Sequence, residues 1–566
     1  MNRILALAVL GTCAAASSPA QMTREQRIAD FQQLASLYAK NYAPYEWKKD
    51  ALKFDLLDLG PWLQRAERSR DDLEFYDLCI EYVASLNDAH DGFYLPSAFT
   101  ASLGFSADIY DDKVLIDSIN RTLLPLKDFP FVAGDELIAL DGKPAEEWLR
   151  ANWKYSIAAN GRSTRRVAAS MIAYRPQEYM PRAHEIGESA SVVVRRQSGE
   201  EETYTIPWQK AGTPIDIVGP VISPKALPAA RAAASDLPGC LRPLAGLYNV
   251  RRGRRTAASL GIGARSPIFT ARPPNFTQRL GRSSNDIFFS GVFEAEGYKI
   301  GFLRIPDYDP YSQALAIQQF ETEIAYFRAG TDGLILDEMR NPGGGACYVQ
   351  SLLARVMPDP FRGMGFEIRA TALWVTAFAE SLALARQQKA EPGTIEMLEA
   401  RLKDVETAYR ENRGRTGPLA LCGLSLDVEP ARDRSGRITA YEKPLMVLVD
   451  EMSSSAADMF PAIIQDHGRG LIAGVRTMGA GGSVVNYDAT NYSEGLASVT
   501  VSLMNRKWPT DREGFPSMPY IENIGVRPDV DLDYMTLENL KTGGKPFVAA
   551  FVAAMVEHIR TRRQEP

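Results

Sequence analysis

A serine cluster between an apolar run and a helical pattern holds the residues of this sequence best suited to chemistry. The run Leu445 to Val449 ends in an acidic turn, and Ser453 to Ser455 follow it. Apolar residues at helical spacing then begin at Ala456. The first N–H groups of a helix have no partner within the helix and favour negative charge, so they suit an oxyanion. The stretch from Pro444 to Val485 therefore suggests an acyl-transfer site with Ser455 as nucleophile.

Ser455 also has a purely structural explanation. Ser455 and Asp458 have the spacing of a capping box, in which the serine only satisfies N–H groups at the helix start. A serine hydroxyl is a weak nucleophile near neutral pH and needs a base, usually a histidine. His467 lies twelve residues further along the predicted helix, about 18 Å away at 1.5 Å per residue, and cannot reach Ser455. The spacing alone leaves catalysis and capping both open.

The other three histidines occupy different settings. His90 stands between two aspartates at the exit of an apolar helical pattern, where a histidine is often only structural. His184 lies in an insertion of a β-rich region, and His558 lies in a basic helical pattern near the C-terminus. The glycine-rich loop from Gly479 to Gly482 offers no lysine as an alternative base. Residue types alone therefore do not assign the base.

Composition argues for a globular protein of several domains. The chain has 566 residues, of which 45% are hydrophobic and 24% charged, and its formal net charge of −6 gives no global case for nucleic acid. No HExxH motif and no local Cys/His cluster is present, so no metal or other cofactor is expected. A disulfide framework is not expected at this size, although an exported chain can form one or two bridges. Four cysteines beyond the N-terminal segment are available: Cys79, Cys240, Cys347 and Cys422.

Residues 1–20 have the pattern of a bacterial secretory signal peptide. A basic start is followed by the apolar run Ile4 to Ala16 and by the small residues Ser18-Pro19-Ala20. The run is too short for a stable anchor, and no later segment of about 20 uninterrupted apolar residues follows, so we expect no stable membrane insertion. Cys13 leaves a lipoprotein open, although Thr12 before it fits poorly. The expected location is the periplasm or the outside of the cell.

Changes of hydrophobic period divide the rest of the chain. Helical periods dominate first, strand-like runs with an Asp-Gly turn follow, and alternating strands and helices come last. The last pattern is typical of an α/β layer. The expected division is a helical N-terminal domain at 21–97, a PDZ-like β-rich domain with an insertion at 98–210, a basic linker at 211–290, and an α/β domain at 291–566 with a helical insertion at 360–440. A PDZ fold binds an extended peptide as an added strand at its sheet edge.

The basic stretch at 225–283 differs in composition from its surroundings. It contains eleven Lys/Arg residues against one acid, Asp236, so its local formal charge is +10. A mobile, solvated insertion explains this composition. A nucleic-acid-binding arm would carry the same charge, but stacking aromatic residues are sparse.

Several motifs in one order resemble the C-terminal processing peptidase and tricorn protease superfamily. They are the loop from Asp337 to Gly344, the SxSSAAD stretch at Ser455, and the GAGG loop at Gly479, together with the preceding PDZ-like region. In the processing-peptidase branch a lysine stands where this chain has Ala480. The departure points to the chlamydial branch of the superfamily, which uses Ser, His and Glu.

The resemblance implies roles that the residues alone do not establish. It implies Ser455 as nucleophile, His90 as general base and Glu522 as the orienting acid, the last in a segment from Tyr520 to Val526. Without it, Glu522 would be an ordinary acid beside a turn. Backbone N–H groups of Ala456, Gly343 and Gly344 are implied as the oxyanion hole. By the same resemblance, residues 225–283 occupy the place of an internal segment that blocks the site until it is cut out.

The expected protein is therefore an exported serine endopeptidase with an α/β core of crotonase-like βα layers. Its expected partners are protein or peptide substrates, not nucleic acid, and a homodimer is left open. One alternative is a catalytically inactive peptide- or lipid-binding member of the superfamily. A second is a coenzyme-A-type enzyme, because glycine loops in a βα core are similar to crotonase-like folds, but a signal peptide argues against it.

Overall fold

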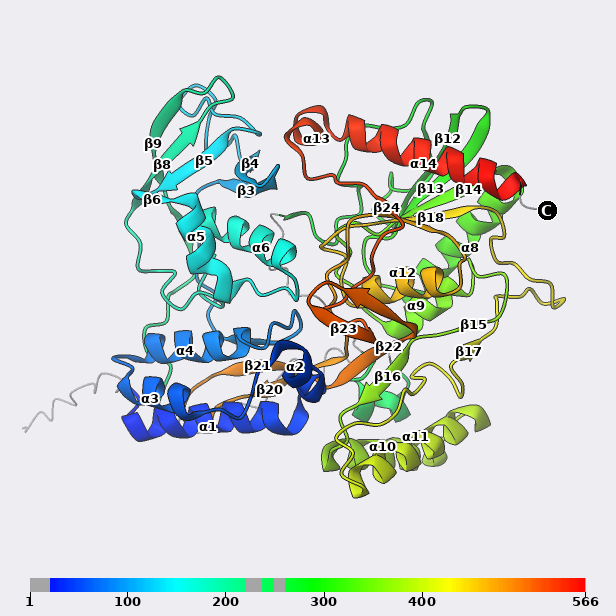
Figure 1. Cartoon of the computed structure of the whole chain (residues 1–566), viewed down its shortest axis with the longest axis horizontal. Coiled ribbons are helices and arrows are strands. Elements are labelled where there is room, and N and C mark those ends of the chain that lie inside the picture. The colour runs from blue at the N-terminus through cyan, green and yellow to red at the C-terminus, as the bar shows by residue number, and fades with distance from the viewer. Residues whose placement is uncertain (1–20, 220–236, 249–259, 565–566) are drawn as a thin grey trace, which may run out of the picture.

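The computed structural model describes residues 21–219, 237–248 and 260–564 and divides them into the parts seen in Figure 1. A helical unit and a β-rich unit lie on one side, and a larger α/β unit lies on the other. The predicted signal peptide at 1–20 lies outside the described residues. None of the described helices has the length and apolarity needed to cross a membrane.

Four helices form the N-terminal unit. Thr23 begins the first of them with a reciprocal cap, since its hydroxyl accepts from Gln26 N and the Gln26 side chain accepts from Thr23 N. The helices bury aromatic residues such as Phe31 and Tyr76 between them. Their bounds are α1 (Arg24–Asn41), α2 (Tyr45–Leu52), α3 (Gly60–Arg68) and α4 (Asp72–Ala84).

A small sheet joins this unit to the C-terminal half of the chain. Strand β1 (Gly92–Tyr94) pairs antiparallel with β21 (Leu496–Thr500), which pairs with β20 (Val484–Asp488). Asp91, just before β1, accepts hydrogen bonds from Thr500 N at 2.8 Å and Thr500 Oγ1 at 3.2 Å. The turn that carries His90 is thereby attached to a segment about 400 residues away in sequence.

The β-rich unit contains one large antiparallel sheet and two helices. The sheet order is β3-β4-β5-β8-β9, with β6 beside β5. Figure 1 shows α5 and α6 together beside this sheet. The bounds are β3 (Phe105–Tyr110), β4 (Lys113–Ile119), β5 (Glu136–Leu140), β6 (Lys143–Pro144), β8 (Ser189–Arg195), β9 (Glu201–Pro207), α5 (Ala145–Asn152), η1 (Trp153–Tyr155) and α6 (Gly161–Ala173), with a small sheet of β2 (Thr100–Ser102), β7 (Tyr174–Pro176) and β10 (Gln209–Ala211).

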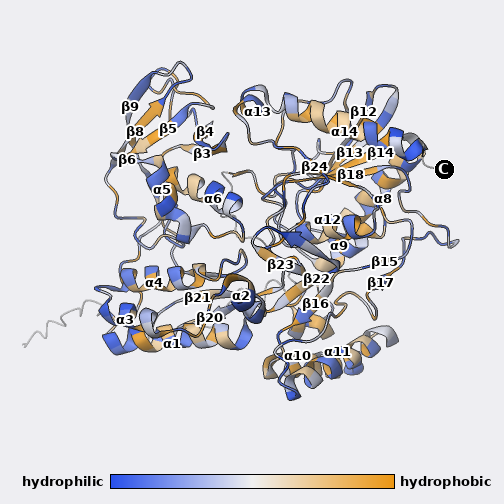
Figure 2. Ribbon diagram, in the orientation of Figure 1, coloured by the Kyte–Doolittle hydropathy of each residue, from blue (hydrophilic) through white to orange (hydrophobic). Residues whose placement is uncertain are grey.

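A seven-stranded sheet forms the centre of the α/β unit. Its order is β11-β12-β13-β14-β18-β19-β24, and the strands from β13 to β24 run parallel. The central strands β14 and β18 are buried along their whole length and mostly apolar, as the orange colour in Figure 2 shows, because both faces of the sheet are covered. The bounds are β11 (Thr277–Gln278), β12 (Phe289–Ala295), β13 (Tyr298–Arg304), β14 (Gly333–Asp337), β18 (Leu445–Val449), β19 (Leu471–Gly474) and β24 (Val530–Asp531).

Alternate residues of each central strand pack into different cores. Leu445, Val447 and Val449 of β18 pack with residues of α8, α9 and α12. Met446 and Leu448 point the other way, toward residues of α14. The helices are α8 (Gln313–Gly330), α9 (Ala346–Leu353), α12 (Ala456–Asp466), α13 (Leu537–Thr542) and α14 (Lys545–Gln564).

Smaller elements complete the α/β unit. Cys347 in α9 forms a disulfide with Cys422, across the predicted helical insertion. From Leu260 onward, residues of the predicted linker pack with the α/β unit, for example Phe269 against Phe302 and Phe551. The remaining bounds are η2 (Gly239–Leu244), β15 (Phe361–Arg362), β16 (Gly365–Ile368), α10 (Ala372–Gln387), α11 (Pro392–Arg410), β17 (Asp427–Val428), β22 (Ser502–Arg512) and β23 (Phe515–Tyr520).

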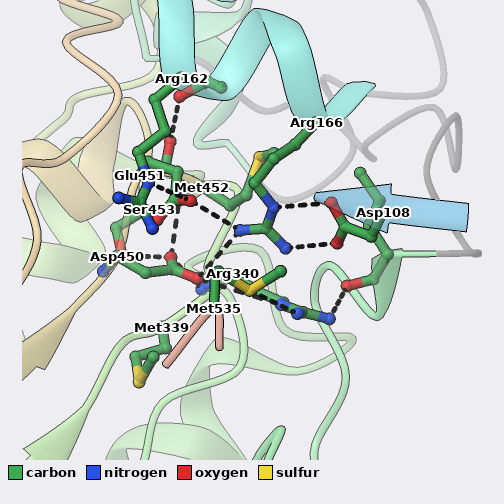
Figure 3. A network of polar contacts seen from close by, with 12 residues as sticks. Asp108, Arg162, Arg166, Met339, Arg340, Asp450, Glu451, Met452, Ser453 and Met535 are labelled. Atoms are coloured by element: carbon green, nitrogen blue, oxygen red, sulfur yellow. Dashed lines mark hydrogen bonds and ion pairs between the residues drawn. The ribbon is translucent and has the colours of Figure 1, made fainter. Parts of the chain in front are cut away.

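A buried network fixes the β-rich unit to the acidic turn ahead of the serine cluster (Figure 3). Arg166 of α6 donates to both oxygens of Asp108 on β3, at 2.9 and 2.7 Å. Its other terminal nitrogen lies 3.1 Å from Glu451 Oε1, which also accepts from Arg162 at 2.7 Å. Burial opposes ionisation of Glu451, but Arg166 and Arg162 lower its pKa. Helix α6 therefore holds the turn that leads to Ser455.

The same network changes the expectation for peptide binding by this unit. Strand β3 lies at the edge of its sheet, where a PDZ-like fold adds a peptide strand. All six residues of β3 are buried, and the N–H of Ile109 is bonded to the Asp108 side chain. Asp111, just beyond β3, donates to Met535 O of the α/β unit. In this arrangement the β3 edge does not lie open to a peptide.

We expect Arg166→Met to lower the free energy of unfolding by about 3–5 kcal/mol, because it leaves buried carboxylates without their partner. Arg165→Met is the matched control. The Arg165 side chain is 33% exposed and pairs with the half-exposed Glu146, so its loss should cost under about 1 kcal/mol. Urea unfolding of both variants measures the difference. Equal midpoints for the two variants would contradict a structural role for the Arg166 network.

Candidate active site

Ser455 stands between a buried strand and a helix. Strand β18 ends at Val449, a five-residue connection follows, and α12 begins directly after Ser455. Ser455 is 4% exposed and has φ 60° and ψ −115°. A residue that only caps a helix has extended backbone angles, and a positive φ is uncommon for a residue with a side chain. The backbone at Ser455 is therefore strained, unlike that of an ordinary helix cap, although the predicted capping box between Ser455 and Asp458 is also present.

The three neighbouring serines have different environments. Ser453 is fully buried; its hydroxyl donates to Glu338 O at 2.8 Å and accepts from Asp450 N at 3.0 Å. Ser454 is half-buried, and its N–H donates to Asn341 O. The contacts of Ser453 fix the turn and leave its hydroxyl no free role.

Glycine at position 343 allows the loop after β14 to touch the serine turn. A Cβ atom at Gly343 would lie 2.7 Å from Ser455 Cβ and 2.8 Å from Ala456 N, closer than real side chains approach. The N–H of Gly343 donates to Asn341 Oδ1 at 2.9 Å. Among the described residues, no acceptor receives the N–H of Ala456 or of Gly344. Of the three groups predicted for an oxyanion hole, Gly343 is thus already engaged, and the other two are free to donate.

The carboxylate of Asp458 joins the serine turn to the glycine-rich loop. Its Oδ2 accepts from Ser455 N at 2.7 Å and from Ala480 N at 3.1 Å. Its Oδ1 accepts from Gly479 N at 2.9 Å and from the Thr477 hydroxyl. Burial raises the pKa of Asp458 to about 6, although these hydrogen bonds lower it. Ala480, where the processing-peptidase branch has a lysine, is buried in this contact.

Glu522 is fully buried on the other side of the same loop. Its Oε2 accepts from Gly481 N at 2.9 Å, and its Oε1 lies 2.6 Å from the ammonium of Lys48. A Cβ at Gly481 would lie 2.2 Å from Glu522 N, so only glycine permits this approach. Without the resemblance, Glu522 would be taken for an ordinary acid beside a turn. That interpretation is wrong, because Glu522 is 0% exposed.

His90 lies in the turn after α4 and is 7% exposed. Its backbone N–H donates to Asp88 Oδ1 at 2.9 Å, and Tyr42 donates to Asp88 Oδ2 at 3.0 Å. Asn523, the residue after Glu522, donates to Asn87 O at 2.8 Å. The structure thus brings the His90 turn and the Glu522 segment into one buried cluster, although they are far apart in sequence.

The cluster holds more carboxylates than cations. Burial and Asp88 together raise the pKa of Glu522 to about 8, against the opposing effect of Lys48. Burial, together with Asp88 and Glu522, raises the pKa of Asp91, and Lys48 again opposes the shift. The Lys48 ammonium is therefore the charge that opposes the upward shift of both pKa values.

Two of the other histidines serve the fold. His467 accepts from Arg362 N at 3.0 Å through Nε2, and its Nδ1 lies 2.9 Å from Ile463 O. His184 pairs with Asp216 at 2.7 Å through Nε2, and its Nδ1 lies 2.9 Å from the Gln177 side-chain nitrogen. Both rings are fully occupied by these contacts, so neither is placed to serve as a base for Ser455.

Lys48 is the site residue that sequence reasoning missed. It shares a short helix with Lys49, and nothing in the pattern YEWKKDAL separates the buried lysine from the exposed one. Asp458 was recognised only as a capping partner. Its bonds to the glycine-rich loop become visible only once the loop is placed.

The chain is similar in sequence to known peptidases. Residues 299–532 match the family described as Peptidase family S41, and residues 99–215 match the PDZ domain. A Chlamydia trachomatis protein is 25% identical over 596 residues, which cover 94% of this chain and 93% of that protein. The chloroplastic C-terminal processing peptidase of Tetradesmus obliquus is 25% identical over 235 residues, 42% of this chain and 35% of its own.

Solved structures show the same fold over nearly the whole chain. The crystal structure of mature CPAF superposes with a TM-score of 0.73 at 21% identity, covering 95% of this chain and 98% of that one. Mature CPAF complexed with lactacystin gives a TM-score of 0.72, with 95% and 99% covered. The predicted similarity to the C-terminal processing peptidase superfamily is confirmed. The chain carries a peptidase family S41 domain at residues 299–532 behind a PDZ domain, and it is a serine-type peptidase.

Proposed function

We propose that the chain is an exported endopeptidase that cleaves protein or peptide substrates with Ser455, His90 and Glu522. The observation that carries the proposal is the backbone of Ser455, at φ 60° and ψ −115° between a buried strand and a helix. Such strain costs about 1–3 kcal/mol and is retained where the arrangement serves a function. A sharp strand-to-helix turn presents the nucleophile in other serine hydrolases as well.

In the proposed first step, Ser455 Oγ forms a bond with the scissile carbonyl carbon while His90 takes the hydroxyl proton. The carbonyl oxygen becomes an oxyanion at the N-terminus of α12, where the N–H groups of Ala456 and Gly344 are free to donate. The C–N bond then breaks, and His90 gives the proton to the leaving amine. An acyl group remains on Ser455.

In the second step, a water molecule replaces the amine. His90 takes a proton from the water as its oxygen bonds to the acyl carbon, and the proton passes to Ser455 Oγ as the ester bond breaks. Glu522 stabilises the positive charge that His90 carries in both steps. Its fixed position between Gly481 N and Lys48 supports this role.

Further parts of the proposal concern the whole chain. We propose export by the signal peptide at 1–20 and a crotonase-like arrangement of the βα layers, and we leave a homodimer open. The alternative, an inactive peptide- or lipid-binding protein, would not require the strained backbone at Ser455.

The triad is tested by turnover of casein by the protein from residue 21 onward. We expect Ser455→Ala and His90→Ala each to lower kcat by about 10⁴-fold or more, because each removes the nucleophile or its base. Glu522→Gln should lower kcat by about 10²-fold or more. Ser454→Ala is the matched control and should stay within about 3-fold of the unmodified protein. Undiminished activity of Ser455→Ala or His90→Ala would contradict the triad.

The sequence predicts a blocking segment at 225–283, but its residues from Leu260 onward pack in the α/β unit. We therefore propose that the part ahead of Leu260 blocks the site until it is cut. Its described residues, 237–248, lie beside the strand that follows the glycine-rich loop. Ser483 Oγ donates to Leu247 O at 2.8 Å, and a Cβ at Gly246 would meet Val485. These contacts, directly after the glycine-rich loop, support the proposal.

A cleavage site for an added protease, placed at residues 226–232, tests this idea. Cutting should raise kcat/KM for a peptide substrate by about 10-fold or more, because the segment would no longer occupy the substrate's place. The unmodified chain treated with the same protease is the control. Equal turnover by the intact and cut forms would refute the blocking role.

A further inference from the structure

Lys48 is a fully buried lysine on an otherwise ordinary short helix. Helix α2 is held against β23 by Trp47, whose ring lies 5.7 Å from that of Tyr520 and 6.1 Å from that of Phe515. Figure 1 shows α2 beside β22, which pairs with β23. The next residue, Lys48, therefore points its side chain into the protein. There it meets Glu522, which follows the end of β23 by two residues in sequence.

The ammonium of Lys48 contacts both segments that carry the proposed base and acid. It lies 2.6 Å from Glu522 Oε1 and donates to Leu86 O and Asn87 O, each at 2.9 Å. The contact with Glu522 is an ion pair, and the two carbonyls accept hydrogen bonds. Asp88 Oδ2, at 3.8 Å, adds a charge interaction without a hydrogen bond.

Such an arrangement is costly unless each partner is in place. A buried ammonium loses its hydration, and a buried carboxylate does so too, so the pair persists only with good geometry and complete hydrogen bonding. Here Lys48 and Glu522 both have 0% side-chain exposure. The second carboxylate oxygen of Glu522 is bound by Gly481 N, so the carboxylate has one orientation.

We propose that Lys48 is a positioning residue for the proposed triad: its ammonium ties the Glu522 carboxylate to the turn that carries His90. This inference rests on the proposed function of Glu522 and His90. Lys48 takes no part in bond making. Lys48 does not take the role of the lysine that the processing-peptidase branch has at the position of Ala480. Its contacts are to Glu522 and to the turn that carries His90.

The charges around Lys48 predict how its removal would change the pH dependence of activity. The charged groups that interact with it are Glu522, Asp88 and Asp91, and the ring of Tyr42 lies 5.9 Å from the ammonium. Lys48 lowers the pKa values of Glu522 and Asp91 against the effect of burial. Without it, Glu522 becomes protonated at higher pH. Because the proposed role of Glu522 needs the carboxylate, activity should then require a more alkaline solution.

Three variants of the mature chain separate charge from packing. Lys48→Met removes both the charge and the donors. Lys48→Gln keeps donors for the carbonyls of Leu86 and Asn87 but removes the charge, and it serves if Lys48→Met does not fold. Lys49→Met is the matched control, because Lys49 follows on the same helix, is half-exposed and pairs only with Asp55 at 3.5 Å among the charged groups.

We expect Lys48→Met and Lys48→Gln to lower kcat for a peptide substrate by about 100-fold with KM within about 3-fold. The acid limb of the plot of kcat/KM against pH should move up by about one pH unit or more in both. In a Glu522→Gln background the same changes should have little further effect on kcat, because the partner is already neutral. Lys49→Met should match the unmodified protein in every measurement.

The outcomes distinguish this inference from the proposed function. If the unmodified protein does not hydrolyse peptides through Ser455, the proposed function fails. If it does, and folded Lys48→Gln keeps an unshifted pH profile or a kcat within 3-fold, Lys48 has no positioning role. A loss that multiplies with that of Glu522→Gln would overturn the inference as well.

Discussion

A single buried carboxylate, that of Asp458, holds together the two loops on which the site depends. Its two oxygens accept from the turn at Ser455, from Thr477 and from the N–H groups at Gly479 and Ala480. The strained backbone of Ser455 persists because this set of bonds fixes it on one side and Gly343 packs on the other. Four donors on one buried carboxylate offset the cost of removing its charge from water.

Hydrogen bonds continue from these loops to parts of the chain that are far away in sequence. Gly481 donates to Glu522, Glu522 pairs with Lys48, and Lys48 binds the carbonyls of the turn that carries His90. On the opposite side, Arg166 of the PDZ domain binds the acidic turn that leads to Ser455. The site is therefore assembled from three units of the fold, and each unit has a buried charged group that anchors it there.

Sequence patterns predicted the layers of this fold better than the contacts that join distant segments of the chain. Runs such as Leu445 to Val449 identify buried parallel strands, because both faces are covered and each residue is apolar. Nothing local reveals that β1 pairs with β21, since both strands are short and their pairing depends on the rest of the fold. For the same reason, the Cys347–Cys422 bridge was only one of several open pairings. The positive φ of Ser455 also depends on its neighbours, so spacing alone left capping open.

Ser455 and His90, 365 positions apart, are proposed to act as one catalytic unit. The most direct test is a double-mutant cycle on kcat with Ser455→Ala, His90→Ala and the variant that carries both. The effects of groups that act together are not additive. We therefore expect the double variant to retain the same residual rate as either single variant. Losses of kcat that multiply in the double variant would show that the two residues act independently, and would contradict a shared catalytic role of Ser455 and His90.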